Sequence, residues 1–414
     1  MAYGSSRGMR AYVNRVFDME RRFNALSEGR INPKIPQGAV LDTWFWGFAK
    51  KLPSTEQVGA LLNDPRWRRH LGLEQEQGGS PDTAARVLDE LLVDEVNELA
   101  LEVFFAARRA GVLKDGGPYG LRCAVIDMNE LFKSEKIHCS HCQEREKTVG
   151  EGTDKRVIKE YYHQAVALVW AGEIAWPIGW ELLRPGEGEL TAAWRLLSRL
   201  LPRLSKSLDL VLSDALYCCR DFFKLTLAHH VGGLAICSGQ TEMDQEMDLF
   251  VREETPQMGT SHVARWEMVS EAWTKEVKSP LRVLHYENLA ASKSYRHTRK
   301  QLRFVTTAKI EMMPLSQGWG TGRARWVIEN GTFNILTQDY NLEHNYHHTT
   351  TAILTLLVLR SLGHCVSKAY WRFAAARSKN APRSFLSWWK EVLEEDWVRY
   401  LDGALVEPAV LRSG

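Results

Sequence analysis

The feature that most constrains the fold is the order of strand-like and helix-like segments between residues 121 and 237. Three runs rich in apolar, β-branched and aromatic residues predict three strands: LRCAVIDM (121–128), VIKEYYHQAVALVWAG (157–172) and IAWPIGWELL (174–183). An amphipathic helix, a fourth strand, a second helix and a fifth strand follow at 187–204, LDLVLSD (208–214), RDFFKLTLAHH (220–230) and GGLAIC (232–237). This order predicts an α/β fold with a mixed sheet flanked by helices.

The rest of the chain divides into regions with different patterns. Residues 1–115 have helical periodicity, and the turn-rich KDGGPYG (114–120) predicts a boundary before the alternating region 116–239. Region 240–318 predicts a small all-β sheet from short charged runs: ARWEMV, AWTKEV, LRVLHYE and LRFVTTAKI. The helical pattern returns over 319–375, and 376–414 is expected to be a helical tail.

Composition limits the class of protein. The chain has 414 residues, 44% of them hydrophobic and 25% charged, which is typical of a globular protein. Its net charge of +2 gives no support for a nucleic-acid partner from bulk charge. Seven cysteines in so long a chain do not suggest a disulfide framework, and the charged N-terminus is unlike a signal peptide, so we expect a cytoplasmic protein. The apolar run 351–363 is too short to span a bilayer and predicts a core helix.

Two aspartates end strands of similar character. Asp127 and Asp214 follow apolar runs, and parallel neighbours bring such strand ends to one edge of a sheet. Carboxylates that meet there can hold divalent cations for phosphodiester chemistry, although each aspartate could also cap a turn. Glu329 is the candidate third carboxylate, because Arg325 one helical turn before it can steady it or clamp a phosphate. An ordinary surface ion pair is the alternative.

These motifs together resemble a known enzyme family. The strand ending in Asp127, then YYHQAVALVWAG, PGEGELTAAWRLLSRL, LDLVLSDALY and RARWVIENGTFNIL...LEHNYHH are similar in kind and order to DDE transposases of bacterial insertion sequences. The resemblance covers roughly residues 80 to 365 and implies an RNase H-like core (116–239 and 319–375) with a β-strand insertion between the second aspartate and the glutamate. The separations, 87 residues (214 − 127) and 115 residues (329 − 214), leave room for that insertion.

The resemblance also implies a mechanism. Asp127, Asp214 and Glu329 would coordinate two Mg²⁺ (or Mn²⁺) ions, which would cut the transposon end and join its 3′-OH to target DNA. The partners would be double-stranded DNA and a second copy of the chain, with residues 1–115 binding inverted repeats or dimerising.

The family branch has a signature of Tyr, Arg, Glu and Lys around the glutamate. Arg325 and Glu329 match it, whereas Gly322 and Leu336 stand at the Tyr and Lys positions. Three groups could replace the missing ones: Trp319, Arg323 or His344. Further candidate DNA contacts are two tryptophans that could stack on a flipped base and a basic stretch in the insertion: Trp266, Trp273, Arg296, Arg299 and Lys300. Each tryptophan could equally be core of the small sheet.

Cys139 and Cys142 form a Cys-x-x-Cys that could supply half of a zinc site. A structural site needs four ligands, and no second such pair lies nearby, so we favour a plain turn between the first two strands. His344, His347 and His348 have metal-binding spacing, but DNA-side or packing roles are preferred for them. Apart from the transposase, a catalytically weak transposase-derived DNA-binding protein, a stand-alone nuclease and a zinc-dependent binding module stay open.

Overall fold

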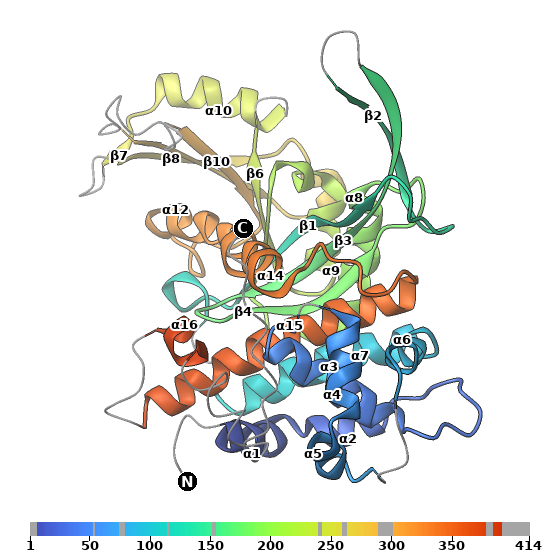
Figure 1. Cartoon of the computed structure of the whole chain (residues 1–414). Coiled ribbons are helices and arrows are strands. Elements are labelled where there is room, and N and C mark those ends of the chain that lie inside the picture. Colours follow the sequence, from blue (N-terminus) through green and yellow to red (C-terminus); the bar gives the residue numbers. More distant parts are fainter. Residues whose placement is uncertain are drawn as a thin grey trace.

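The computed structural model describes residues 6–52, 54–73, 79–113, 116–150, 155–238, 242–258, 263–288, 301–377 and 384–390. Its centre is one ten-stranded mixed sheet (Figure 1). The strand order is β2-β3-β1-β5-β6-β10-β9-β8-β7, and β4 pairs with β3 beside this path. The strands are β1 Cys123–Ser134, β2 Gln143–Val149, β3 Arg156–Ala171, β4 Ala175–Leu182, β5 Leu210–Ser213, β6 Gly232–Cys237, β7 Gln257–Met258, β8 Val263–Ser270, β9 Leu281–Asn288 and β10 Gln301–Thr306.

The middle of the sheet confirms the α/β expectation. β3 is antiparallel to both β1 and β4, whereas β1, β5 and β6 are parallel. Such parallel strands are buried on both faces, which explains why their sequences are continuous apolar runs. Each strand expected between 121 and 237 is present.

An ion pair at the start of β1 and β5 fixes their register. Arg122 donates its backbone N–H to Asp209 Oδ2 at 2.8 Å, and its guanidinium Nε donates to the same oxygen at 3.1 Å. Because a slip of one residue would break this pairing and turn every side chain to the opposite face, the pair specifies one alignment of the two strands. Val125 is consequently the partner of Leu212.

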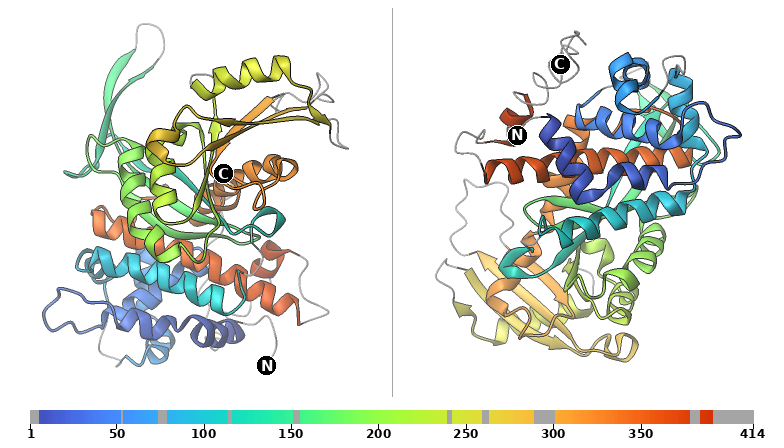
Figure 2. Two further views of the ribbon diagram at one scale, coloured as in Figure 1. Left: turned by 180° about the vertical axis from the view of Figure 1, so that it is seen from behind. Right: turned by 90° about the horizontal axis from the view of Figure 1, so that it is seen from below.

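Helices cover the sheet on several sides. α8 (Glu189–Leu204) packs on β3 and β4, and α9 (Arg220–Ala228) packs on β6 (Figure 2). The other side of this part of the sheet carries a helical segment in four pieces: α12 Leu315–Arg323, α13 Trp326–Ile328, η4 Glu329–Phe333 and α14 Asn334–Tyr340. Of these, α13 contacts β1 and β3.

The N-terminal region is helical, as expected. It forms a layer together with α15 (Thr350–Ala375). The right-hand view of Figure 2 shows this layer from below. Its helices are α1 Ser6–Phe17, α2 Met19–Asn24, α3 Gln37–Ala49, α4 Thr55–Asn63, α5 Pro65–His70, α6 Pro81–Asp89 and α7 Val93–Arg109. α15 is long and apolar enough to cross a membrane, but 83% of its most apolar stretch is buried in the fold, as in a core helix.

Region 240–318 differs from its prediction in two ways. It is not a separate all-β sheet, because β10 pairs antiparallel with β6 and so continues the central sheet. It also contains the helices α10 (Glu242–Glu253) and α11 (Thr274–Val277). The run AWTKEV, expected as a strand, ends in α11, where Trp273 and Val277 are both buried at helical spacing.

The tail beyond residue 375 is described only in part. α16 (Phe385–Trp388) packs against α15, and the Trp389 indole donates to Ala49 O at 2.9 Å. The rest of the expected tail, 378–383 and 391–414, lies outside the described residues.

Candidate active site

Asp127 and Asp214 lie on neighbouring parallel strands. Continuing the register of β1 and β5 by two residues beyond Val125 and Leu212 sets them opposite each other. The expectation that the first strand ends at Asp127 is wrong, because β1 runs on to Ser134 with β3 as its partner. The parallel pairing with β5 ends at Val125, so Asp127 is paired only with β3, through Ala167.

Both aspartates also accept local hydrogen bonds. Asp127 Oδ1 accepts the Met128 N–H at 2.9 Å. Asp214 Oδ1 accepts the Leu216 N–H at 2.9 Å and caps the short helix η3 (Ala215–Tyr217). The two interpretations of the sequence are therefore compatible: Asp214 caps a turn and still faces the same edge as Asp127.

Glu329 reaches this edge from the other half of the chain. It begins η4, a π-helical turn inserted between α13 and α14. Such turns are rare and are often found at functional sites. The Arg325 guanidinium Nη1 lies 3.0 Å from Glu329 Oε1 and 3.7 Å from Asp127 Oδ2. One nearly buried cation thus joins two carboxylates that are 202 residues apart (329 − 127).

The electrostatics of Asp127 show how close the acidic groups are. The pKa of Asp127 is raised to about 6, mainly by burial and also by the charges of Asp214 and Glu329, while the Met128 N–H and Arg325 act in the opposite direction. Placing like charges together in a partly buried site favours the protonated form. A divalent cation would relieve the same repulsion.

Glu189, the first residue of α8, is a fourth carboxylate that the sequence reasoning did not identify. Burial raises its pKa to about 7, and the charges of Asp127 and Asp214 act in the same direction. The Tyr217 hydroxyl donates to Glu189 Oε1 at 2.7 Å and holds the carboxyl in place. From sequence, Glu189 was visible only as an acid in the first turn of a helix.

The four side chains are carboxylates, and carboxylate oxygens are the ligand type that Mg²⁺ and Mn²⁺ prefer. Burial is the main cause of the raised pKa values of Asp127 and Glu189. Within the described residues, however, the only group whose ligand atoms all lie within 4.8 Å of one another is a different one, of cysteines and histidines.

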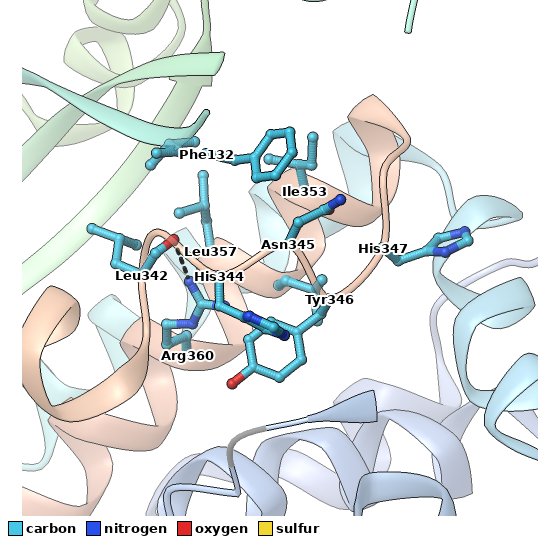
Figure 3. Close-up of a pocket in the computed structure, with 11 residues that line it drawn as sticks. Phe132, Leu342, His344, Asn345, Tyr346, His347, Ile353, Leu357 and Arg360 are labelled. Carbon is cyan, nitrogen blue, oxygen red and sulfur yellow. Dashed lines mark hydrogen bonds between the residues drawn. The ribbon is translucent and has the colours of Figure 1, made fainter. Parts of the chain in front are cut away.

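The proposed DNA-contacting residues have different environments. Arg323 is exposed and lies over the Trp319 ring at 5.9 Å, and Trp326, beside Arg325, is also exposed. His344 is exposed on the loop between α14 and α15, stacked edge-on against Tyr346 (Figure 3). Arg296, Arg299 and Lys300 lie outside the described residues.

Trp266 and Trp273 do not offer a free ring face for stacking. Both are buried, with 8% exposure each. The Trp266 indole donates to Glu254 O at 3.0 Å, and Trp273 packs near Phe223. The structure therefore corrects the assignment of these residues to DNA and supports their alternative role in the core.

The two departures from the family signature are part of the core. Gly322 is buried and its backbone lies close to the Phe304 ring, so that a side chain at position 322 would overlap the ring. Leu336 is 1% exposed. At these two positions the chain has packing groups where the signature has a DNA-contacting tyrosine and lysine.

The Cys-x-x-Cys turn has the partners that sequence reasoning missed. Cys139 and Cys142, between β1 and β2, lie beside His163 of β3 and His348 of the α14–α15 loop. His347 is not part of this group, since its Nε2 lies 2.8 Å from Asp89 Oδ2. The expectation that no second pair of ligands lies near the cysteines is therefore wrong.

Comparison with known proteins adds no assignment: no protein-family model matches the chain. No curated protein matches its sequence significantly either.

Proposed function

We propose that the chain is a metal-dependent DNA-cleaving and strand-transferring enzyme of the DDE transposase type. The observation that carries the proposal is the meeting of Asp127, Asp214 and Glu329 from three distant parts of the chain, with Arg325 between two of them. A cluster of partly buried like charges is costly for a structure that has no use for it, and a raised pKa like that of Asp127 is typical of functional sites.

The sheet supports the finer fold assignment as well. A meander of three antiparallel strands that continues into two parallel strands, with helices on its faces, is compatible with an RNase H-like core. In that core, β7 to β10 and α10 would be the insertion before the catalytic glutamate, joined to the core sheet through β6 and β10.

Each residue of the site has a part in the proposed reaction. Asp127, Asp214 and Glu329 would hold Mg²⁺ or Mn²⁺, which when bound supplies an activated water or 3′-OH and stabilises the leaving 3′ oxygen. Arg325 neutralises the carboxylates and orients Glu329 through the 3.0 Å contact. Glu189, held by Tyr217, adds negative charge beside Asp127 and Asp214.

The DNA would approach the exposed side of this cluster. Arg323 and Trp326 flank Arg325 on the same helical segment and are exposed, so that a cation and an aromatic ring are available for phosphate and base. The substrate would be double-stranded DNA at terminal inverted repeats. A second copy of the chain would bind the other end.

A second function has a specific observation in its favour. Because Gly322 and Leu336 are packed in the core, two DNA contacts of the family signature are lacking at these positions. A transposase-derived protein that binds DNA with little or no cleavage would show this pattern while it keeps the basic surfaces.

A cleavage assay separates the two functions. Purified protein with Mg²⁺ or Mn²⁺ is incubated with labelled duplexes that span the DNA on either side of its own reading frame. Wild type is compared with Asp214→Asn and with the control Asp221→Asn, whose carboxylate is exposed on α9. We expect metal-dependent nicking at a fixed position, followed by strand joining, in wild type and Asp221→Asn but not in Asp214→Asn.

Binding without cleavage in all three proteins would refute the enzymatic proposal and favour the DNA-binding alternative. Cleavage without strand joining would instead identify a nuclease. Cleavage by Asp214→Asn at the wild-type rate would show that the carboxylate cluster is not the site.

A further inference from the structure

We propose that Cys139, Cys142, His163 and His348 form a structural zinc site. The site is separate from the carboxylate cluster and does not depend on the proposed function. Its four ligand atoms come from three places: the turn between β1 and β2, the middle of β3, and the loop between α14 and α15. Two thiolates and two imidazoles are a ligand set that selects Zn²⁺ over Mg²⁺ or Ca²⁺.

Three of the distances between ligand atoms lie within about 0.2 Å of those in a tetrahedral zinc site, and a fourth is shorter. With Zn–S near 2.3 Å and Zn–N near 2.05 Å, tetrahedral geometry requires about 3.8 Å between sulfurs and about 3.6 Å between sulfur and nitrogen. The Sγ atoms of Cys139 and Cys142 are 3.8 Å apart. His163 Nε2 lies 3.6 Å from Cys139 Sγ and 3.4 Å from Cys142 Sγ, and His348 Nε2 lies 3.2 Å from Cys142 Sγ.

The turn also places the two cysteine sulfurs close together. The Cys139 backbone N–H donates to Cys142 Sγ at 3.3 Å, and the Cys142 N–H donates to Cys139 O at 3.2 Å. These contacts fold the Cys-x-x-Cys into a tight knuckle with both sulfurs on one side.

Burial indicates a closed, structural site rather than a catalytic one. Cys142 is 5% exposed and His163 is 1% exposed, and Cys139 and His348 are half-buried. A catalytic zinc needs an open coordination position, whereas four protein ligands complete the shell. His163 is buried in the middle of β3, and its Nε2 lies near both cysteine sulfurs. A metal ion bound by these three atoms would explain this arrangement.

The loop that carries His348 is held in place by contacts on both sides of it. His347 lies against Asp89 at 2.8 Å, and the Thr349 hydroxyl donates to the same carboxylate. Arg360 donates to Leu342 O at 3.0 Å, the bond drawn in Figure 3. The Phe132 ring packs edge-on against the His348 ring at 4.9 Å. The fourth ligand is thus positioned by the protein itself.

The site would connect parts of the chain that are far apart in sequence. Cys142 and His348 are separated by 206 residues, and His348 follows Glu329 by 19 residues (348 − 329). Zinc bound here would join the β1–β2 turn to the loop that follows the helical segment bearing Glu329. The unfolded chain does not hold these four ligands together, so zinc binds the folded chain preferentially and its binding free energy adds to the stability of the fold.

The test is the metal content of the purified full chain. Protein prepared without chelators and reconstituted with Zn²⁺ is analysed by elemental mass spectrometry, and we expect about one zinc per chain. Replacement by Co²⁺ should give the visible bands of a tetrahedral site together with a thiolate-to-cobalt charge-transfer band. Removal of zinc with a chelator should lower Tm, and added Zn²⁺, but not Mg²⁺, should restore it.

Variants then identify the ligands. Cys142→Ser and His348→Ala should weaken zinc binding by more than the roughly 10- to 100-fold that loss of an outer-shell partner costs. His141→Ala is the matched control, because His141 is exposed beside Cys142 and outside the four-residue group. It should keep its zinc and its Co²⁺ spectrum.

Three outcomes would overturn the proposal: wild type that takes up no zinc, a Cys139–Cys142 disulfide in its place, or full zinc retention in His348→Ala and Cys142→Ser. If a variant does not fold, the zinc content and Co²⁺ spectrum of the wild type decide the matter by themselves.

Discussion

Gly322→Ala tests the close packing of α12 against the Phe304 ring. A Cβ at position 322 would lie within 2.8 Å of three ring atoms of Phe304. Ordinary carbon–carbon contact is about 3.5–4.0 Å, so the ring would have to move by about 1 Å. Phe304 is 1% exposed and packs edge-on against Tyr286 at 6.0 Å, so it has little room to do so.

The magnitude follows from two opposing effects. Overpacking a core site costs about 1–3 kcal/mol, and alanine regains up to about 1 kcal/mol of helix propensity over glycine. We therefore expect a net loss of about 1–2 kcal/mol in the free energy of unfolding. For a cooperative unit of 150–250 residues this lowers Tm by roughly 2–8 °C.

Gly320→Ala, in the same helix, is the matched control. Its Cβ would meet three atoms of the Tyr119 side chain within 3.0 Å, but Tyr119 is 57% exposed and can swing into solvent. We expect this variant to be as stable as wild type or more stable. Both variants are compared by scanning calorimetry, and equal Tm values for the two would refute the account of Gly322.

The remaining predictions concern charge. Arg325→Met removes the cation between Asp127 and Glu329, so metal-free protein should unfold at a lower temperature, and Mn²⁺ should raise the Tm of the variant more than that of wild type. Burial raises the pKa of Asp42 to about 7, so its contribution to stability is present below pH 4 and is lost as the pH rises to 7. The free energy of unfolding of Asp42→Asn, measured in urea between pH 5 and pH 8, should therefore exceed that of wild type by up to about 2–3 kcal/mol. Glu189→Gln should likewise raise the free energy of unfolding of the metal-free protein at pH 8, by about 1–2 kcal/mol; the effect is smaller because Glu189 is partly exposed. A variant less stable than wild type at pH 8 would contradict this prediction.

The strands of the core could be predicted from sequence because burial on both faces requires continuous apolar runs. β2 could not, since its sequence QEREKTV has only one apolar residue. It is held by cross-strand charge pairs instead, such as Lys159 with Glu144 at 2.6 Å and Arg145 with Glu160. α10 was missed as well, although the buried Met243 and Met247 have helical spacing.

The candidate sites were predictable to different degrees. Asp127 and Asp214 follow recognisable strands, so their proximity could be expected before the structure was known. Glu189 could not be placed, because its position depends on how α8 packs across β3 and β4. His163 is one residue in the middle of a long strand, and His348 is 206 residues from Cys142, so neither has a local signal that links it to the cysteines.

The pairing of β10 with β6 has a consequence for synthesis on the ribosome. β6 is completed at Cys237, but the strand that covers its edge begins only at Gln301, 64 residues later (301 − 237). At 5–20 residues per second the apolar edge of β6 has no β10 partner for roughly 3–13 s. An open edge of this kind can pair with another nascent chain. Slow or interrupted translation between these two strands should therefore promote aggregation, which trigger-factor-like chaperones acting on the emerging chain would counter.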